Sequence, residues 1–218
     1  MVKAVIYDLD DLMVNSAPLH FEAWEVTLNK FGHSFKDLPK GYMTQFMGTR
    51  VIDSAIALVR DLNLKVSVET IFKIRNKIFL GMVRSKLQPM GGLLYSLKLL
   101  KKNGFKIALA SSATKQYLDF VLKKFNLGEY FDVLVSGDDV RLGKPHPQTY
   151  LIACKKLNLK PSECLVLEDA THGIDAAKRA GCKCIGVENS FTPYQDRSKA
   201  DKILPSLKAL TLDIVNTV

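Results

Sequence analysis

The sequence predicts an α/β fold, a doubly wound parallel sheet with a small all-helical unit inserted after its first strand. From residue 89 onward, apolar runs of strand length alternate with segments whose apolar residues recur at helical spacing. Residues 17–86 break this rhythm, because they contain amphipathic helical patterns and no clear strand. Polar clusters follow four of the strand candidates, and the carboxyl ends of parallel strands are where such sheets bind ligands.

Residues 3–7, KAVIY, predict a buried first strand, and three carboxylates follow it directly. Asp8, Asp10 and Asp11 lie within four residues of one another. Mutual repulsion and loss of hydration both oppose this arrangement, so we expect a bound cation to compensate. A charged loop after a strand is the alternative interpretation. Asp11 is better explained as a turn or helix-capping residue than as a ligand.

The helical insertion follows the acidic segment. Amphipathic patterns cover residues 19–32, 51–64 and 67–84, and Pro89-Met90-Gly91-Gly92 marks the return to the sheet. We therefore expect a core domain of residues 1–16 and 87–218, and a helical domain of residues 17–86.

The remaining segments alternate with short connections. Expected helices cover residues 91–104, 115–127, 146–159 and 171–181, and expected strands cover residues 105–112, 131–137, 163–169 and 182–188. Because strands joined by helices run parallel, their carboxyl ends meet at one edge of the sheet. The polar clusters along the chain should therefore converge there.

Three further clusters supply candidate site residues. Ser111 and Ser112 precede a helix, where free N–H groups and the positive helix end favour phosphate, although simple N-capping would explain the same residues. Lys144, between Gly143 and Pro145, could hold a phosphate and a carboxylate together, or it could be a surface lysine in a turn. Glu168 and Asp169 offer hard oxygen ligands suited to Mg²⁺, although Asp169 could instead cap the next helix.

Together these clusters provide an acidic metal cage, a phosphate seat and one lysine. Phosphoryl transfer needs such parts: a carboxylate nucleophile, a cation to neutralise charge, and an acid/base for the leaving oxygen.

Composition and charge exclude several other classes. The 218 residues are 47% hydrophobic and 24% charged, which is typical of globular proteins, and no apolar run approaches the length of a membrane span. The net charge of +9 is spread over lysine pairs on helix backs, so we expect no nucleic-acid partner but a mild attraction for anionic small molecules. The four cysteines lack zinc-site spacing, and the residues before the first strand lack the pattern of a secretory leader, so we expect none. We expect a cytoplasmic monomer with reduced thiols and no membrane contact.

DLDDLMVNS, ASSAT, GKPHPQTY and VLED resemble, in this order, the four motifs of the haloacid dehalogenase (HAD) superfamily. The helical insertion after the first motif is similar to the cap domain of these enzymes, and the branch that the chain resembles most contains β-phosphoglucomutase-like proteins and sugar-phosphate phosphatases. The resemblance implies a Rossmann-like core. Asp11 and Asn15 stand where close relatives often have Gly and Asp, and neither departure removes a catalytic group.

The resemblance also implies roles for the first-motif carboxylates. Asp8 would be the nucleophile that forms an aspartyl-phosphate. Asp10 would protonate the leaving alcohol and then activate the hydrolytic water, while its backbone carbonyl ligates Mg²⁺. Dehalogenases and phosphonatases lack an acid at the position of Asp10, so its presence favours phosphate esters of alcohols.

The other motifs complete the implied site. Ser111 and the N–H of Ser112 would hold the transferring phosphoryl group, and Lys144 would bridge that group and Asp8. Asp169 would ligate Mg²⁺ directly, with Glu168 as a second ligand or positioned through water.

Residues of the cap help to distinguish a phosphatase from a mutase. In FMGTRVIDS, which resembles the substrate-specificity loop, Met47 precedes Gly48 where the mutase carries lysine, and Arg50 follows two residues after the glycine instead of three. We therefore predict a phosphatase acting on a small phosphorylated metabolite, a sugar or polyol phosphate, with Gly48 and Arg50 as substrate-binding residues. A β-phosphoglucomutase-like isomerase is the alternative, and a non-enzymatic binder is a third possibility that the presence of Asp10 opposes.

Three cap positions permit two interpretations each. His20 either relays between the cap and the core, as a substrate-site residue, or caps the first cap helix. Trp24 lies one turn further along the same helical face, where packing is a commoner role than substrate stacking. Arg75 either reaches the site from the third cap helix or lies on a solvated face.

Overall fold

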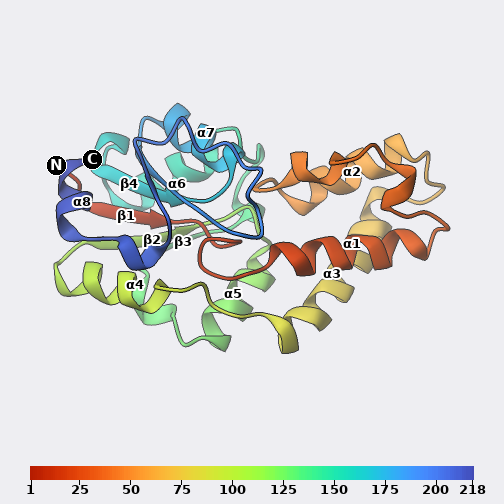
Figure 1. Cartoon of the computed structure of the whole chain (residues 1–218), viewed down its shortest axis with the longest axis horizontal. Coiled ribbons are helices and arrows are strands. Elements are labelled where there is room, and N and C mark those ends of the chain that lie inside the picture. The colour runs from red at the N-terminus through yellow and green to blue at the C-terminus, as the bar shows by residue number, and fades with distance from the viewer.

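A six-stranded parallel sheet forms the centre of the larger part of the molecule (Figure 1). The computed structural model describes residues 1–218. The strand order is β3-β2-β1-β4-β5-β6, so the chain moves outward from β1 in both directions and the order reverses beside it. The strands are β1 (Ala4–Tyr7), β2 (Lys106–Ala110), β3 (Val133–Val135), β4 (Cys164–Glu168), β5 (Lys183–Val187) and β6 (Lys202–Leu204).

Helices cover both faces of this sheet, as the burial of all four residues of β1 requires. Val5 and Tyr7 belong to a hydrophobic cluster with α4 and α5, whereas Ala4 and Ile6 belong to a second cluster with α6 and α7. The predicted doubly wound fold is confirmed. The helices of this part are α4 (Leu93–Lys102), α5 (Lys115–Lys124), α6 (Gln148–Leu157), α7 (Thr171–Ala180) and α8 (Leu212–Thr217).

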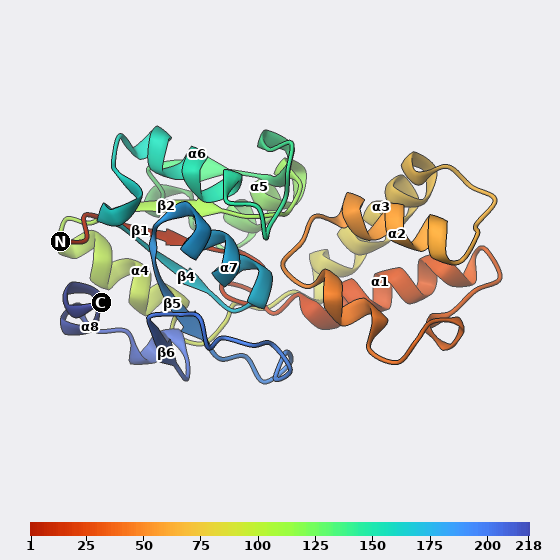
Figure 2. The same cartoon turned by 90° about the horizontal axis from the view of Figure 1, so that it is seen from above.

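A separate helical unit, residues 17–86, lies beyond the carboxyl ends of the strands (Figure 2). It contains α1 (Ala17–Asn29), α2 (Val51–Asp61), α3 (Val68–Lys86) and two 3₁₀ turns, Phe35–Asp37 and Tyr42–Phe46. It has its own hydrophobic cluster, in which Trp24, Leu28 and Ile71 meet. The far end of α3 leaves that cluster, because Phe79 and Val83 pack into the core of the sheet.

Two chain segments join the helical unit to the sheet, and they are hydrogen-bonded to each other. The N–H of Asn15 donates to the carbonyl of Gln88 at 2.9 Å, and the N–H of Met90 donates to the carbonyl of Met13 at 2.8 Å. Val14 and Pro89 therefore form an antiparallel bridge. The connection is a short two-stranded ribbon.

Besides short 3₁₀ turns, the structure adds one strand and one α-helix that the sequence pattern does not predict. In β6 only Leu204 is buried, and α8 has six residues, so both are too short to show periodicity. The remaining expected helices and strands are present, β3 being shorter than expected. No helix combines the length and apolar character needed to cross a bilayer. All four cysteines are buried and free.

Two glycines are expected to respond to substitution in opposite directions. Gly92 has a φ of +92° before α4, and an added Cβ would overlap the backbone of Lys208, whereas Gly81 is exposed in α3 with nothing within 4 Å of an added Cβ. Gly92→Ala should lower the free energy of unfolding by about 1–3 kcal/mol from the backbone conformation alone. Gly81→Ala should raise it by about 1 kcal/mol. Urea denaturation measures both, and changes of the same sign would show that backbone conformation and space do not govern these two positions.

Candidate active site

Three neighbouring strands bring polar residues to one edge of the sheet. Tyr7 of β1 is in register with Leu109 of β2 and Leu167 of β4. The residues that follow these strands, or end them, are therefore brought together: Asp8, Ser111 and Glu168.

Lys144 lies between two of these carboxyl groups. Its Nζ is 2.5 Å from Oδ1 of Asp8 and 2.7 Å from Oε1 of Glu168, and its side chain is completely buried. Burial alone would lower the pKa of Lys144, but the two carboxylates outweigh it and raise that pKa above its ordinary value. The alternative interpretation of a surface lysine is wrong.

Glu168 is held by four donors. Its Oε1 accepts from Lys144 and from the hydroxyl of Tyr150 at 2.8 Å, and its Oε2 accepts from the backbone N–H groups of Asp169 and Ala170. Gly173 makes this position possible, because any Cβ there would overlap the carboxylate. Glu168 thus fixes the lysine, a role that its position in the sequence does not reveal.

Three buried carboxylates could hold a divalent cation. Oxygens of Asp8, Glu168 and Asp169 all lie within 4.8 Å of one another. Burial raises the pKa of Asp8 and of Asp169 well above the usual range, and neighbouring carboxylates raise it further. Hard oxygen donors whose ionisation is this unfavourable fit a cation such as Mg²⁺, which would favour their charged form.

Asp10, the fourth predicted metal residue, directs its carboxylate away from this cluster. Its Oδ1 is 3.4 Å from Nε2 of His20, while its backbone carbonyl accepts none of the backbone hydrogen bonds of the chain. The structure therefore leaves only the carbonyl of Asp10 available to a cation. The carboxylate of Asp10 faces His20 instead, and the carbonyl that the family resemblance assigns to Mg²⁺ has no backbone partner.

His20 in turn is oriented by Arg75. Nδ1 of His20 faces the guanidinium of Arg75, which can only donate, so Nδ1 accepts and Nε2 carries the proton directed at Asp10. Burial opposes ionisation of Asp10, but His20 holds its pKa below the ordinary value. Arg75 is 1% exposed, and its guanidinium carbon lies 4.4 Å from the ring centroid of Phe79, so the solvated-face interpretation is wrong. Sequence periodicity alone does not place this arginine.

The two serines after β2 have different environments. The hydroxyl of Ser111 accepts from the N–H of Ala113 at 3.0 Å, and the hydroxyl of Ser112 donates to the carbonyl of Gly48 in the helical unit at 2.8 Å. Thr114, and not either serine, caps α5 through its hydroxyl. No backbone hydrogen bond uses the N–H of Ser112, nor those of Leu9 and Asp10, so these three donors are free to bind an anion.

Gly48 and Arg50 do not face the same space. Gly48, with a φ of +76°, lines the pocket above Asp8, and a Cβ there would lie 2.9 Å from Cβ of Ala170. Arg50 lines a different hollow, where it forms two hydrogen bonds with Asp53 at 2.8 and 3.0 Å and donates to the carbonyl of Val140. The structure thus does not bring Arg50 into the pocket, because a carboxylate three residues further along the chain holds its guanidinium elsewhere.

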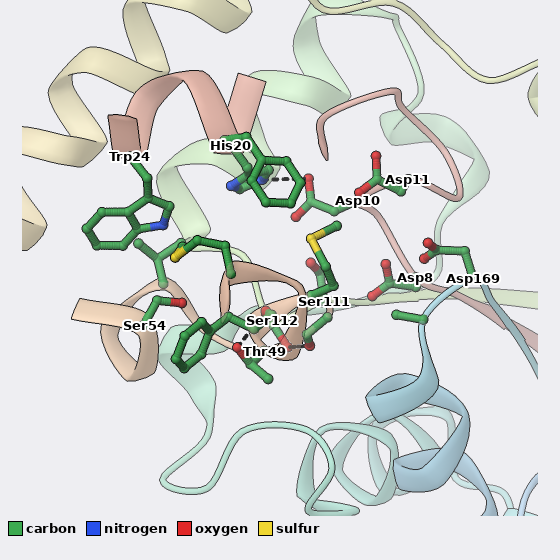
Figure 3. Close-up of a pocket in the computed structure, with 17 residues that line it drawn as sticks. Asp8, Asp10, Asp11, His20, Trp24, Thr49, Ser54, Ser111, Ser112 and Asp169 are labelled. Carbon is green, nitrogen blue, oxygen red and sulfur yellow. Dashed lines mark hydrogen bonds and ion pairs between the residues drawn. The ribbon is translucent and has the colours of Figure 1, made fainter. Parts of the chain in front are cut away.

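The pocket itself lies between the sheet edge and the helical unit (Figure 3). Asp8, Asp10, Asp169 and the two serines line one side. Trp24 and Ser54 lie across from them, on the helical unit. A small molecule bound here would have its reacting group at the acidic side.

A sequence profile described as haloacid dehalogenase-like hydrolase matches residues 5–187. The chain belongs to this family. A phosphorylated carbohydrates phosphatase of Thermotoga maritima is 32% identical over 192 residues, which are 87% of this chain and 87% of that relative. A validoxylamine A 7'-phosphate phosphatase of Streptomyces hygroscopicus subsp. limoneus is 28% identical over 225 residues, with 95% of each chain covered. Both names agree with the sugar-phosphate phosphatase branch that the motifs indicate.

Solved structures of the family have the same architecture. A β-phosphoglucomutase from Clostridium difficile superimposes with a TM-score of 0.86 at 26% identity, covering 99% of this chain and 96% of that one. CbbY from Rhodobacter sphaeroides in complex with phosphate superimposes with a TM-score of 0.85 at 23% identity, covering 96% of each chain, a likeness that shows the fold alone.

Replacing the buried lysine should be costly. Lys144→Met leaves two buried carboxylates without their cation, so with chelator present the free energy of unfolding should fall by about 3–5 kcal/mol. The loss should shrink as the pH falls, because Asp8, whose pKa burial already raises, then becomes neutral in the folded variant while the unfolded chain still carries a carboxylate there. Urea denaturation at several pH values measures both effects.

Lys115→Met is the matched control. Lys115 is exposed and pairs with Asp119 on the surface of α5, so its removal should leave the free energy of unfolding nearly unchanged. Equal losses in the two variants would show that the pairing of Lys144 does not stabilise the fold.

Proposed function

We propose that this protein is a Mg²⁺-dependent phosphatase that hydrolyses a small phosphorylated metabolite, a sugar or polyol phosphate, through an aspartyl-phosphate intermediate. The observation that carries the proposal is the position of Asp8: its buried carboxylate contacts Lys144 and faces the pocket that Asp10 also lines. The relatives named as phosphatases of phosphorylated carbohydrates and of validoxylamine A 7'-phosphate support it.

In the first half of the reaction, an oxygen of Asp8 forms a bond to phosphorus as the bond to the leaving alcohol breaks. The free N–H groups of Leu9 and Ser112 would bind phosphoryl oxygens, while the Lys144 ammonium, which contacts Asp8, would hold that carboxylate in place. Mg²⁺, held by Asp8, Asp169 and the carbonyl of Asp10 with Glu168 beside them, would neutralise negative charge on the transferring group.

Asp10 serves as acid and then as base. His20 favours its ionised form, which suits the second half, where Asp10 removes a proton from the water that attacks the aspartyl-phosphate. In the first half, an incoming phosphate adds negative charge beside Asp10 and raises its pKa, so that it binds the proton that the leaving alcohol needs. In each turnover Asp10 thus donates one proton to the leaving alcohol and regains one from the attacking water.

We also propose that residues 17–86 act as a cap domain over the core of residues 1–16 and 87–218. The hydroxyl of Ser112 and the ring of His172 contact the carbonyls of Gly48 and Met47, respectively, at the seam. These contacts join the two units around the pocket, which supports exclusion of water during phosphoryl transfer.

A phosphoglucomutase-like isomerase is the second candidate, favoured by the structural likeness to the Clostridium difficile enzyme. A mutase must hold a second phosphate while the first is transferred. No lysine or arginine is among the residues that line the pocket, so the phosphatase is the better supported of the two.

Phosphate release tests the proposal directly. Across a panel of sugar, polyol, nucleotide and glycolate phosphates with Mg²⁺, at least one ester should release phosphate. Asp8→Asn should lower kcat by at least ~10⁴ and Asp10→Asn by ~10²–10⁴, since the first removes the nucleophile and the second the acid/base.

Asp119→Asn, an exposed carboxylate on α5, is the control and should retain full activity. Release that persists in Asp8→Asn would refute the aspartyl-phosphate mechanism. Conversion of β-glucose 1-phosphate to the 6-phosphate without net release would establish the mutase instead.

Metal dependence gives a separate prediction. Chelation should abolish phosphate release and added Mg²⁺ should restore it, whereas Asp169→Asn should raise the Mg²⁺ concentration for half-maximal activity at least about tenfold, because a hard oxygen ligand is lost. Titration of activity against Mg²⁺ measures the shift. Full activity of the wild type in excess chelator would contradict the metal assignment.

A further inference from the structure

The helical unit presents an apolar surface to the pocket. Its contribution is dominated by uncharged aromatic, thioether and aliphatic side chains: Phe21, Trp24, Met43, Phe46, Met47 and Val51. Figure 3 shows Trp24, the labelled member of this wall, across the pocket from Asp8 and Asp169. The part of a substrate that lies away from the phosphate must therefore contact an apolar wall.

The arginines of the helical unit that lie nearest the pocket are turned away from it. Arg50 is paired with Asp53 in a different hollow, and Arg75 is buried beside His20. No lysine or arginine lines the pocket. A second phosphate or a carboxylate on the substrate would lose its hydration at this wall without gaining a cation.

Two polar atoms interrupt the apolar wall. The indole N–H of Trp24 and the hydroxyl of Ser54 have no hydrogen-bond partner in the chain, and neither belongs to the fully buried unpartnered atoms, which are Asn15 Oδ1, Ser16 Oγ, Arg75 Nε, Tyr117 OH and Thr149 Oγ1. Trp24 is 3% exposed and Ser54 is 4% exposed, and both residues line the pocket. The small accessible surface that these two atoms retain therefore faces the pocket, where a ligand can reach them.

Two other hydroxyls that line the pocket already donate hydrogen bonds within the chain. Thr49 donates to the carbonyl of Phe46 at 2.7 Å, and Ser112 donates to the carbonyl of Gly48. Trp24 itself is fixed, because the guanidinium of Arg75 lies 5.5 Å from its ring centroid. The indole N–H of Trp24, a donor, and the hydroxyl of Ser54, a donor and acceptor, are thus available to a ligand at the end of the pocket away from Asp8.

We infer that Trp24 and Ser54 determine specificity, and that the substrate is the monophosphate of an uncharged cyclic polyol of monosaccharide or cyclitol size. A ring hydroxyl distant from the phosphate accepts from the indole N–H and exchanges a hydrogen bond with Ser54, while the C–H surface of the ring packs on the apolar wall. Esters with a second anionic group are rejected. The inference rests on the proposed phosphatase function, and it adds the substrate class and the two residues that recognise it.

The first experiment compares kcat/KM for a hexose 6-phosphate, the matching hexose 1,6-bisphosphate and 2-phosphoglycolate. The neutral monophosphate should exceed each of the two esters with an additional anionic group by at least ~10-fold. In Met47→Lys, which places a cation in the apolar wall, the ratio of bisphosphate to monophosphate should rise by ~10-fold or more. A wild-type preference for the bisphosphate or for phosphoglycolate would overturn the inference.

The second experiment isolates the hydrogen bonds. Phenyl phosphate presents an apolar ring with no hydroxyl, so the ratio of kcat/KM for the hexose phosphate to that for phenyl phosphate reports recognition of the ring hydroxyl. Trp24→Phe and Ser54→Ala should each lower this ratio by ~5–20-fold. Because both substrates are measured on the same preparation, a partly unfolded variant leaves the ratio unaffected.

Ser85→Ala, on an exposed part of α3, is the control and should leave the ratio unchanged. Ratios in Trp24→Phe and Ser54→Ala equal to the wild-type ratio would overturn the roles of both residues. If the wild type hydrolyses none of these esters or any other member of the panel, the proposed function fails as well. Hydrolysis with the opposite selectivity refutes the specificity inference alone.

Discussion

The buried ammonium of Lys144 is the interaction on which the rest of the site depends. Asp8 and Glu168 end up side by side because β1 and β4 are neighbours, and without a cation between them neither could remain ionised in the core. Four donors fix Glu168, and Glu168 fixes the lysine that reaches Asp8. The nucleophile is thereby held in one orientation before any ligand arrives, which is the preorganisation that electrostatic catalysis requires.

The carboxylates of Asp8 and Asp10 lie in different environments because each faces a different partner, although the two residues are close together in the sequence. Asp8 faces Lys144 within the sheet unit, whereas Asp10 faces His20, a residue of the helical unit. Burial and neighbouring carboxylates push the pKa of Asp8 up, and His20 holds that of Asp10 down. Two aspartates two residues apart thus acquire different chemistry, one suited to bind a cation and phosphorus and the other to move protons.

Strand-end positions are the most informative part of the sequence. Ser111, Lys144, Glu168 and Asp169 can be identified beside Asp8 because the carboxyl ends of parallel strands must converge, and the structure brings them together. Lys144 lies in a loop, and the sequence alone does not decide whether its side chain enters the site or lies on the surface. The convergence of the strand ends does not reveal which hydrogen-bond and ion-pair partners each side chain has.

The residues that sequence reasoning misses or misplaces depend on such partners. Tyr150 is a typical helix core residue until its hydroxyl is seen to reach Glu168, and Arg75 joins the site through His20, 55 positions away. The specificity-loop resemblance predicts Arg50 in the pocket. Asp53, three residues later, is a sequence signal for the ion pair that instead holds the arginine against α2. Recognition of β6 and α8 fails for another reason, since neither is long enough to complete a pattern.

The ribbon formed by residues 13–15 and 88–90 constrains how the pocket can exchange its contents. The two segments are hydrogen-bonded to each other, so they bend together more readily than they twist or slide past each other. Any opening of the helical unit would therefore swing about a single axis close to Asp10 and Asp11. On return, the carbonyl of Gly48 would meet the hydroxyl of Ser112 at the sheet edge in the same position each time. Product release would then need only a bend of this ribbon, and closure would return the helical unit to the same position over the sheet.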